Sequence, residues 1–337
     1  MYPLPSVPIY TPQQTLKEVA DLAGVAPMTV SRVINNPDAV KEKTRIKVES
    51  AMKELRYTPN IAAKSLATNR CGVIDVFIPE AIDLSNPFVM HFIAGISSVL
   101  SEHYYSFLIL RNRNQEHQCD GYIVTGLLKN ETQEFAQYAK ERERPVVLFG
   151  HTDIPDVDCI DVDNIAGAKT AVSHLLRQGH RRIAMVNVRE DKDYTADRLE
   201  GYKQALEENG IAFDPDLVLY ASNSVDGGES AADELMKRQK VSAVFCATDT
   251  IAIGVSSKLK NHGYSIPGDI SLVGFDGLGH QLLANPTITT IKQPIYELGR
   301  LLADTLLDRL SGRKERVNRM VSPTLMFGQS DSSIQSV

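Results

Sequence analysis

The chain has 337 residues, of which 43% are hydrophobic and 23% charged, with a formal net charge of -6. At about 100 to 200 residues per domain, this length allows two or three domains, and the composition excludes a single small peptide-like fold and a wholly disordered chain. No apolar run reaches the ~20 residues that span a bilayer, and the opening lacks a signal segment, so we expect a cytoplasmic protein without membrane contact.

The charge is distributed unevenly along the chain. Residues 1–70 hold ten Lys and Arg against six Asp and Glu, a net charge of +4, whereas the remainder holds 26 against 36, a net charge of -10. A basic head on an acidic body indicates a nucleic-acid-binding module attached to a second functional unit.

The head begins with a stretch rich in proline, residues 1–14, which we expect to be a disordered leader. A helix then starts at Thr15, because Thr15 and Glu18 form the Thr-x-x-Glu capping box, and it ends at Gly24. A second short helix begins at Pro27 and a third spans about 44–56. Residues 15–58 are therefore predicted to form a three-helix domain with a helix-turn-helix.

The head contains a more specific sequence pattern than a generic pair of amphipathic helices would need. Residues 15–35 read TLKEVADLAGVAPMTVSRVIN, followed by YTPN at 57–60 and AKSL at 63–66. This stretch resembles the lac repressor and galactose repressor (LacI/GalR) family of bacterial transcription regulators. The resemblance extends over nearly the whole chain from Thr15 onward.

The resemblance implies a DNA contact for several head residues. Pro27, Met28 and Arg32 occupy base-reading positions, where Arg32 suits a guanine edge and the other two offer only apolar contacts. Five further side chains are implied to contact phosphates, which position the head without reading sequence: Thr15, Thr29, Ser31, Asn35 and Thr44. Ala26 and Lys41 depart from the family, which often has Ser as a helix cap at both positions.

Residues 59–71 are expected to form a hinge helix and linker. The resemblance implies that the segment from Asn60 to Ala67 orders on operator DNA, with Asn60 and Leu66 as contacts. Leu66 would enter the minor groove as a wedge that unstacks a base step. The alternative is that Leu66 is a linker residue packed on the body.

From residue 72 to 337 short apolar runs alternate with amphipathic helical stretches. Buried strands are predicted in two groups: 73–78, 106–110, 122–124 and 146–149, then 183–186, 217–219, 243–246 and 272–275. Predicted helices include 165–178, 195–208, 229–238, 251–262 and 296–310. This alternation predicts an α/β body of parallel sheets flanked by helices, in two lobes. The resemblance likewise implies a body like the periplasmic sugar-binding proteins.

One connection in the first lobe departs from the family. Only ten residues, 111–120, separate Leu110 from Gly121, where the family has a full helix. A parallel crossover needs about a dozen or more residues. We therefore expect a non-helical connection, an altered strand order or a shorter strand.

The effector site is expected between the lobes, because ligands of open parallel sheets bind beyond the carboxyl ends of the strands. The resemblance implies that Arg198 binds effector hydroxyls or carboxylates and that Asp276 is the family's effector aspartate, with Asp249 in the neighbouring loop. Thr248 stands where several sugar-responsive members have Asn, which predicts altered specificity. Asp163 lies in the segment that crosses between the lobes, next to Asn164, which either contacts the effector or caps a helix.

The loop after the first strand resembles the family's Asn-Pro-Phe loop at the cleft mouth. Its implied effector contacts are Asp83, Ser85, Asn86 and Phe88. Phe88 could stack on a sugar face or belong to the core, and the sequence leaves both possibilities open.

No pattern in the sequence indicates a cofactor or a metal. Four dispersed cysteines, Cys71, Cys119, Cys159 and Cys246, form no Cys-x-x-Cys pair and no zinc spacing. We interpret them as reduced structural thiols, with a redox or metal role as the weaker alternative. Acid pairs at 161 and 163 and at 191 and 193 are of a kind that is usually solvated.

Together these features predict a DNA-binding transcription regulator, a repressor whose partners are operator DNA, a small effector and a second copy of the chain. The effector is expected to be a sugar or sugar derivative that releases the protein from DNA. The alternative is an enzyme of sugar metabolism carrying a DNA-binding head, but the chain shows no phosphate-binding loop, nucleophile elbow or His-Glu-x-x-His pair. A solute-binding protein for transport is a third, weaker possibility.

Overall fold

The computed structural model describes residues 14–35, 39–57, 70–114, 117–237 and 240–334. The chain separates into two compact units, Met1–Cys71 and Gly72–Val337. They correspond to the basic head and the acidic body, and each is treated by itself below.

The described part of the head contains three helices, α1 (Leu16–Ala23), α2 (Pro27–Asn35) and α3 (Glu42–Glu54). The expected capping box is present: Thr15 N donates to Glu18 Oε2 at 2.6 Å and Glu18 N donates to Thr15 Oγ1 at 3.3 Å. Gly24 ends α1 in the left-handed conformation, at a φ of 65°. Helix α3 begins and ends two residues earlier than predicted, and Lys41 precedes it without a side-chain cap.

A small apolar core joins the three helices. It consists of Val19, Ala20, Ala23, Val30, Val33, Val48 and Ala51. These residues lie at helical spacing on the inner face of each helix, so their burial explains why helices this short hold together.

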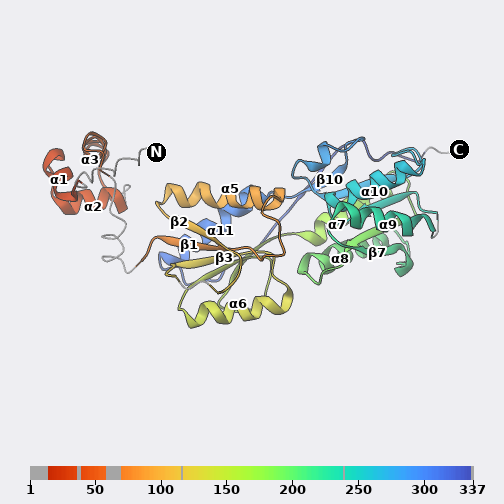
Figure 1. Cartoon of the computed structure of the whole chain (residues 1–337), viewed down its shortest axis with the longest axis horizontal. Coiled ribbons are helices and arrows are strands. Elements are labelled where there is room, and N and C mark those ends of the chain that lie inside the picture. The colour runs from red at the N-terminus through yellow and green to blue at the C-terminus, as the bar shows by residue number, and fades with distance from the viewer. Residues whose placement is uncertain (1–13, 36–38, 58–69, 115–116, 238–239, 335–337) are drawn as a thin grey trace, which may run out of the picture. The chain divides into compact units, whose positions relative to one another are not determined.

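The body contains two six-stranded sheets, which define its two lobes (Figure 1). Lobe 1 has the order β11-β5-β4-β3-β1-β2, all parallel. Its strands are β1 (Val73–Phe77), β2 (Ser106–Leu110), β3 (Gly121–Val124), β4 (Val146–Phe149), β5 (Asp158–Val162) and β11 (Asn318–Val321). Its helices are α5 (Pro87–Glu102), α6 (Lys129–Glu141) and α11 (Ile295–Leu310).

Lobe 2 has the order β12-β10-β9-β8-β6-β7, with only β12 antiparallel. Its strands are β6 (Ile183–Val188), β7 (Val218–Ala221), β8 (Ala243–Cys246), β9 (Ser271–Asp276), β10 (Thr289–Lys292) and β12 (Thr324–Met326). Its helices are α7 (Asn164–Arg177), α8 (Asp193–Glu208), α9 (Val225–Lys237), α10 (Asp249–Asn261) and the short η2 (Pro215–Leu217) and η3 (His280–Leu282).

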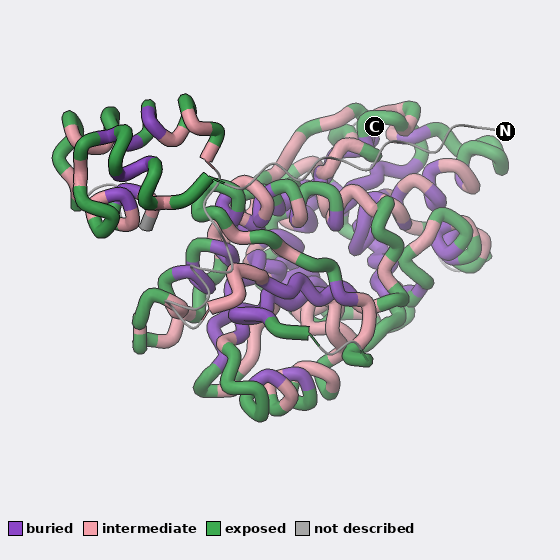
Figure 2. The backbone as a smooth tube through the Cα atoms, turned by 60° about the vertical axis from the view of Figure 1, so that its left-hand side comes forward, coloured by how far each residue is buried: buried purple, intermediate pink, exposed green. Residues whose placement is uncertain are grey.

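The chain crosses between the lobes three times, after β5, after β10 and after β11. The buried residues concentrate in the strands and on the helix faces that cover them (Figure 2). The two-lobed α/β architecture predicted from the sequence is confirmed. The strands β5, β10, β11 and β12 were absent from that prediction.

The short connection of lobe 1 is non-helical in its described residues, 111–114 and 117–120. Strands β2 and β3 both pair in parallel with β1, so the connection crosses over β1. Because no helix from these described residues covers this edge of the sheet, Leu108 of β2 is 47% exposed. Of the three expected solutions, the structure uses the non-helical one.

Candidate functional site

The exposed face of α2 presents the side chains predicted to read bases. Pro27, Met28 and Arg32 are exposed, and the Met28 side chain is 66% exposed although it is apolar. Met28 and Arg32 lie four residues apart and therefore share one face of the helix. An exposed methionine beside an arginine on a basic surface is suited to contact with DNA.

The residues predicted to contact phosphates lie around this face. Thr29, Ser31 and Thr44 are partly exposed and Thr15 is exposed. The hydroxyl of Thr15 is already used by the cap, where it accepts from Glu18 N and donates to Glu18 Oε2 at 2.9 Å. Asn35 ends α2, while Asn60 and Leu66 lie outside the described residues.

In lobe 2 the predicted effector residues meet at the carboxyl ends of the strands. Arg198 on α8 is 3% exposed and lies over the ring of Phe275, with its guanidinium carbon 3.7 Å from the ring centroid. Its Nε donates to Asn164 Oδ1 at 3.0 Å and its Nη1 donates to the carbonyl of Ala247. Burial lowers the pKa of this arginine, but hydrogen bonds and nearby carboxylates hold it in place.

Two carboxylates complete this network. Asp276 Oδ1 lies 3.8 Å from Arg198 Nη1 and accepts from Gln293 Nε2 at 2.8 Å. Asp249 accepts from Thr290 Oγ1 at 2.6 Å and from Gly277 N at 2.8 Å. Burial raises the pKa of Asp276 to about 7 and that of Asp249 to about 6, because removal from water disfavours the charged carboxylate.

The backbone of Asp276 is strained, which marks the site further. Its φ is 139°, in the region that favours glycine. Such strain persists where the surroundings hold it in place and is concentrated at binding sites.

Thr248 and Asp163 both cap helices. Thr248 Oγ1 accepts from Ile251 N at 3.2 Å and donates to Asn223 Oδ1 at 2.8 Å. Asp163, not Asn164, is the cap of α7, where it accepts from Ala166 N at 2.9 Å. Asn164 instead orients Arg198, so the interpretation of Asn164 as a helix cap was wrong.

In lobe 1 the loop before α5 holds the other predicted effector residues. Ser85 N donates to Asp83 Oδ1 and Phe88 N donates to Asn86 Oδ1, both at 2.9 Å. Phe88 is partly buried and its ring lies 5.6 Å from Phe92 and 5.3 Å from Phe149. Phe88 thus packs against the core of lobe 1, and a stacking role toward a sugar stays a prediction.

Polar contacts join the two lobes beside this network. Lys192 Nζ of lobe 2 donates to the carbonyl of Gly126 in lobe 1 at 2.6 Å, and Lys129 lies 3.7 Å from Asp191. His151, after β4, lies 3.7 Å from Asp197 on α8. These contacts hold the predicted effector residues of lobe 2 close to the ends of β4 and β5.

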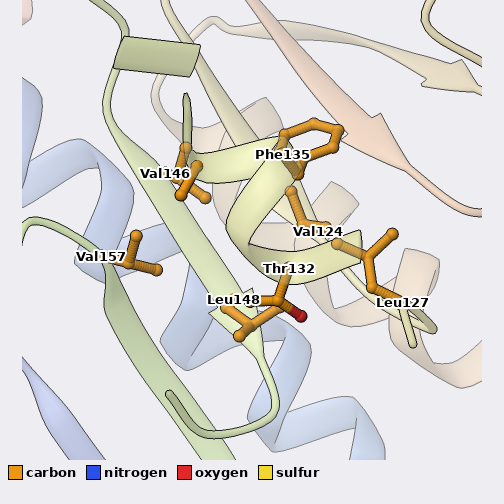
Figure 3. A pocket seen from close by; sticks show the side chains of 8 residues that line it. Val124, Leu127, Thr132, Phe135, Val146, Leu148 and Val157 are labelled. Atoms are coloured by element: carbon orange, nitrogen blue, oxygen red, sulfur yellow. The ribbon is translucent and has the colours of Figure 1, made fainter. Parts of the chain in front are cut away.

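An apolar pocket lies elsewhere in lobe 1, between α6 and the sheet (Figure 3). It is lined by Val124, Leu127, Thr132, Phe135, Ala136, Val146, Leu148 and Val157. Its side chains offer a single hydroxyl, that of Thr132, so it provides little for a sugar to bind. None of the predicted effector residues lines it.

A helix-turn-helix head joined to a two-lobed body of parallel sheets defines a class of ligand-controlled DNA-binding regulators. Residues 15–60 match the family described as "Bacterial regulatory proteins, lacI family", and residues 172–330 match the "Periplasmic binding protein-like domain". In the described part of the chain, no helix is both long and apolar enough to cross a membrane.

Several relatives match the chain over most of its length. An uncharacterized regulator of Bacillus subtilis, YvdE, is 37% identical over 88% of this chain and 92% of its own. The regulator CelR of Thermobifida fusca is 34% identical over 92% and 96%, and the repressor CytR of Escherichia coli K12 is 33% identical over 89% and 90%. The chain belongs to the lacI family of bacterial regulatory proteins and is a helix-turn-helix transcriptional regulator.

Solved structures give the same result. The CelR–cellobiose complex aligns with a TM-score of 0.73 at 32% identity and covers 94% of this chain and 99% of its own. The lac repressor dimer bound to operator and the anti-inducer ONPF aligns with a TM-score of 0.73 at 26% identity, covering 95% and 99%.

Proposed function

We propose that this regulator is a repressor that binds operator DNA through α2 and is released by a sugar or sugar derivative bound between the lobes. The network centred on Arg198 is the observation that carries the proposal. It combines a buried guanidinium, two carboxylates of raised pKa and two aromatic rings, Tyr194 on α8 and Phe275 on β9.

This combination suits a polyhydroxyl ligand. The contacts described for Arg198 use Nε and Nη1, so Nη2 can donate to a ligand hydroxyl. Asp249 and Asp276 supply acceptors, and the rings of Tyr194 and Phe275 that contact the Arg198 guanidinium limit where it can move. CelR, which shares this architecture, forms a complex with cellobiose, which supports a sugar as the effector class.

The proposed contacts extend to the head and to lobe 1. Arg32, Pro27 and Met28 would read bases, with Asn60 and Leu66 as hinge contacts. The loop 83–88 and Asp163 would close on the effector from lobe 1. Residues 15–58, 59–71 and 72–337 would then act as DNA-binding domain, hinge and effector domain.

The proposal includes a homodimer and no catalysis. Two heads are needed to read a palindromic operator, and the lac repressor binds its operator as a dimer, so we infer that two copies associate through their bodies. The relatives above are regulators or repressors. As a DNA-binding regulator it would act in the cytoplasm, and turnover of a candidate sugar would favour the enzyme alternative.

The test is operator binding measured by fluorescence anisotropy at fixed salt, with and without a panel of sugars and sugar phosphates. DNA upstream of the neighbouring genes serves as the probe. We expect specific binding that one sugar weakens, and loss of specific binding in Arg32→Met. A sugar that tightens binding would overturn release, and absence of specific DNA binding would overturn the proposal as a whole.

A further inference from the structure

Three donor atoms from both lobes converge beside the effector network. His151 Nδ1 lies 3.4 Å from Asp161 Oδ2 and 3.7 Å from Asp197 Oδ2, and the three atoms all lie within 4.8 Å of one another. His151 follows β4, Asp161 belongs to β5, and Asp197 lies on α8 of lobe 2. The Asp161 side chain is 6% exposed, so the interpretation of this acid as solvated was wrong.

The geometry is close to that of a metal coordination shell. Ligand atoms about 2.0 to 2.1 Å from a tetrahedral zinc ion lie about 3.3 Å from one another. The two distances from His151 Nδ1 match this spacing, and a small movement of the Asp197 carboxylate would complete it. One imidazole nitrogen and two carboxylate oxygens suit a first-row transition-metal dication better than Mg²⁺, because Mg²⁺ prefers oxygen ligands alone.

We propose that His151, Asp161 and Asp197 bind a divalent transition-metal ion that bridges the two lobes. The proposal does not depend on the identity of the effector or on DNA binding. It replaces the sequence-based expectation that the chain has no metal site.

The charges around the three donors favour a dication. Asp193 is a third carboxylate facing His151. Two cations face these acids: Lys129 from α6, which also lies near Asp191, and Arg198, which interacts with Asp161. A neutral imidazole and the two carboxylates of Asp161 and Asp197 would bring two negative charges to the site, which a dication would neutralise.

A bound ion would have a mechanical consequence. His151 and Asp161 belong to lobe 1 and Asp197 to lobe 2, so the ion would favour the arrangement of the lobes seen here. A ligand that binds one arrangement better shifts the population toward it. Metal would therefore change operator affinity in whichever direction this arrangement sets, as a second input beside the effector.

The test uses the full chain after dialysis against a chelator, titrated calorimetrically with ZnCl₂ and, in parallel, with MgCl₂. We expect one zinc ion per chain at this site and at least tenfold weaker or no binding of Mg²⁺. His151→Ala and Asp197→Asn should each weaken zinc binding at least 100-fold, with circular dichroism confirming that both variants fold.

Matched controls separate this site from others. His117→Ala removes a histidine that pairs with Asp75 at 2.7 Å, and Asp191→Asn removes an 85% exposed acid adjacent to the cluster. Both should bind zinc as the unchanged chain does. Zinc should raise the Tm of the unchanged chain and of both controls, but not of His151→Ala.

Two results would overturn the proposal. One is the absence of zinc binding by the unchanged chain. The other is undiminished zinc binding by His151→Ala or Asp197→Asn, which would place the ion elsewhere, for example on a cysteine, and would show that His151 only forms ion pairs. Neither result bears on the operator-binding test, so the two proposals fail separately.

Discussion

Replacing Asp158 with alanine should strongly destabilise lobe 1. Its carboxylate is 1% exposed and accepts from Arg309 Nε at 2.9 Å, Arg309 Nη2 at 2.6 Å, Arg313 Nη2 at 2.8 Å and Val317 N at 2.7 Å. The carboxylate thus ties the start of β5 to the end of α11 and to the segment that leads into β11. Asp158→Ala would leave two partly buried guanidinium groups and one backbone N–H without this partner.

The expected cost follows from burial. Removing one partner of a buried pair costs about 3 to 5 kcal/mol. Because both arginine side chains are 20% exposed, water can reach them in part, and we expect about 3 kcal/mol. The matched control is Glu134→Ala, which breaks an ion pair with Arg113 whose side chains are 57% and 40% exposed, and should cost at most about 1 kcal/mol.

Urea unfolding at pH 7, followed by circular dichroism, measures both variants without the ionic screening of guanidinium. Although burial raises the pKa of Asp158, the hydrogen bonds from Arg309 and Arg313 outweigh it and lower the pKa. Its contribution is therefore complete above the unfolded pKa of about 3.9 and is lost as the pH falls through the lower folded value. Equal urea midpoints for Asp158→Ala and Glu134→Ala at pH 7 would refute this reasoning.

Three further predictions concern packing, pH and the effector. Gly201→Ala should cost about 1 to 3 kcal/mol in urea unfolding, because its Cβ would lie 2.2 Å from the Ile165 carbonyl oxygen, whereas Gly268→Ala meets only the movable Ser265 side chain and should cost less. Burial lowers the pKa of His180, so the folded protein favours the neutral imidazole. The contribution of His180 to the free energy of unfolding is therefore complete above pH about 6.5 and declines as the pH falls toward the folded pKa. His180→Asn should lack this part of the pH slope, and identical slopes between pH 5 and 7.5 would contradict the assignment. Arg198→Met should keep its operator affinity but should need about 10-fold to 150-fold more effector in anisotropy titrations, because it loses a charged hydrogen bond of about 1.5 to 3 kcal/mol. The control, Arg182→Met, changes a partly exposed residue of lobe 2 and should respond to the effector normally.

Local sequence signals were sufficient to predict the helices of the head and the central strands of both sheets. The capping box at Thr15 and the glycine at 24 set the limits of α1 through contacts within three residues, which sequence displays directly. Strands β5, β10, β11 and β12 were missed, because each contains polar residues that interrupt its apolar run. With β10 missed, Thr290 and the neighbouring Gln293 could not be recognised as the groups that hold Asp249 and Asp276.

Contacts between residues that lie far apart in the sequence could not be predicted from the sequence. Asn164 was predicted to contact the effector or to cap a helix, yet its amide oxygen orients Arg198 from 34 positions away. His151, Asp161 and Asp197 come from three elements in two lobes, so no spacing in the sequence brings them together. Only the pairing of β4 with β5 and the position of α8 place their donor atoms within one coordination shell.

The length of the short connection in lobe 1 predicted part of its structure but not all of it. Ten residues indicated the loss of a helix, but the face left uncovered depends on strand register, which the count does not contain. Asp75 pairs with Leu108 in the parallel ladder, so both side chains lie on the face that contains Phe77 and Leu110. The connection supplies His117, which pairs with Asp75 at 2.7 Å, but it leaves Leu108 about half exposed. One imidazole thus satisfies the buried acid where a helix would have added apolar cover, which explains how Asp75 is tolerated in the middle of β1.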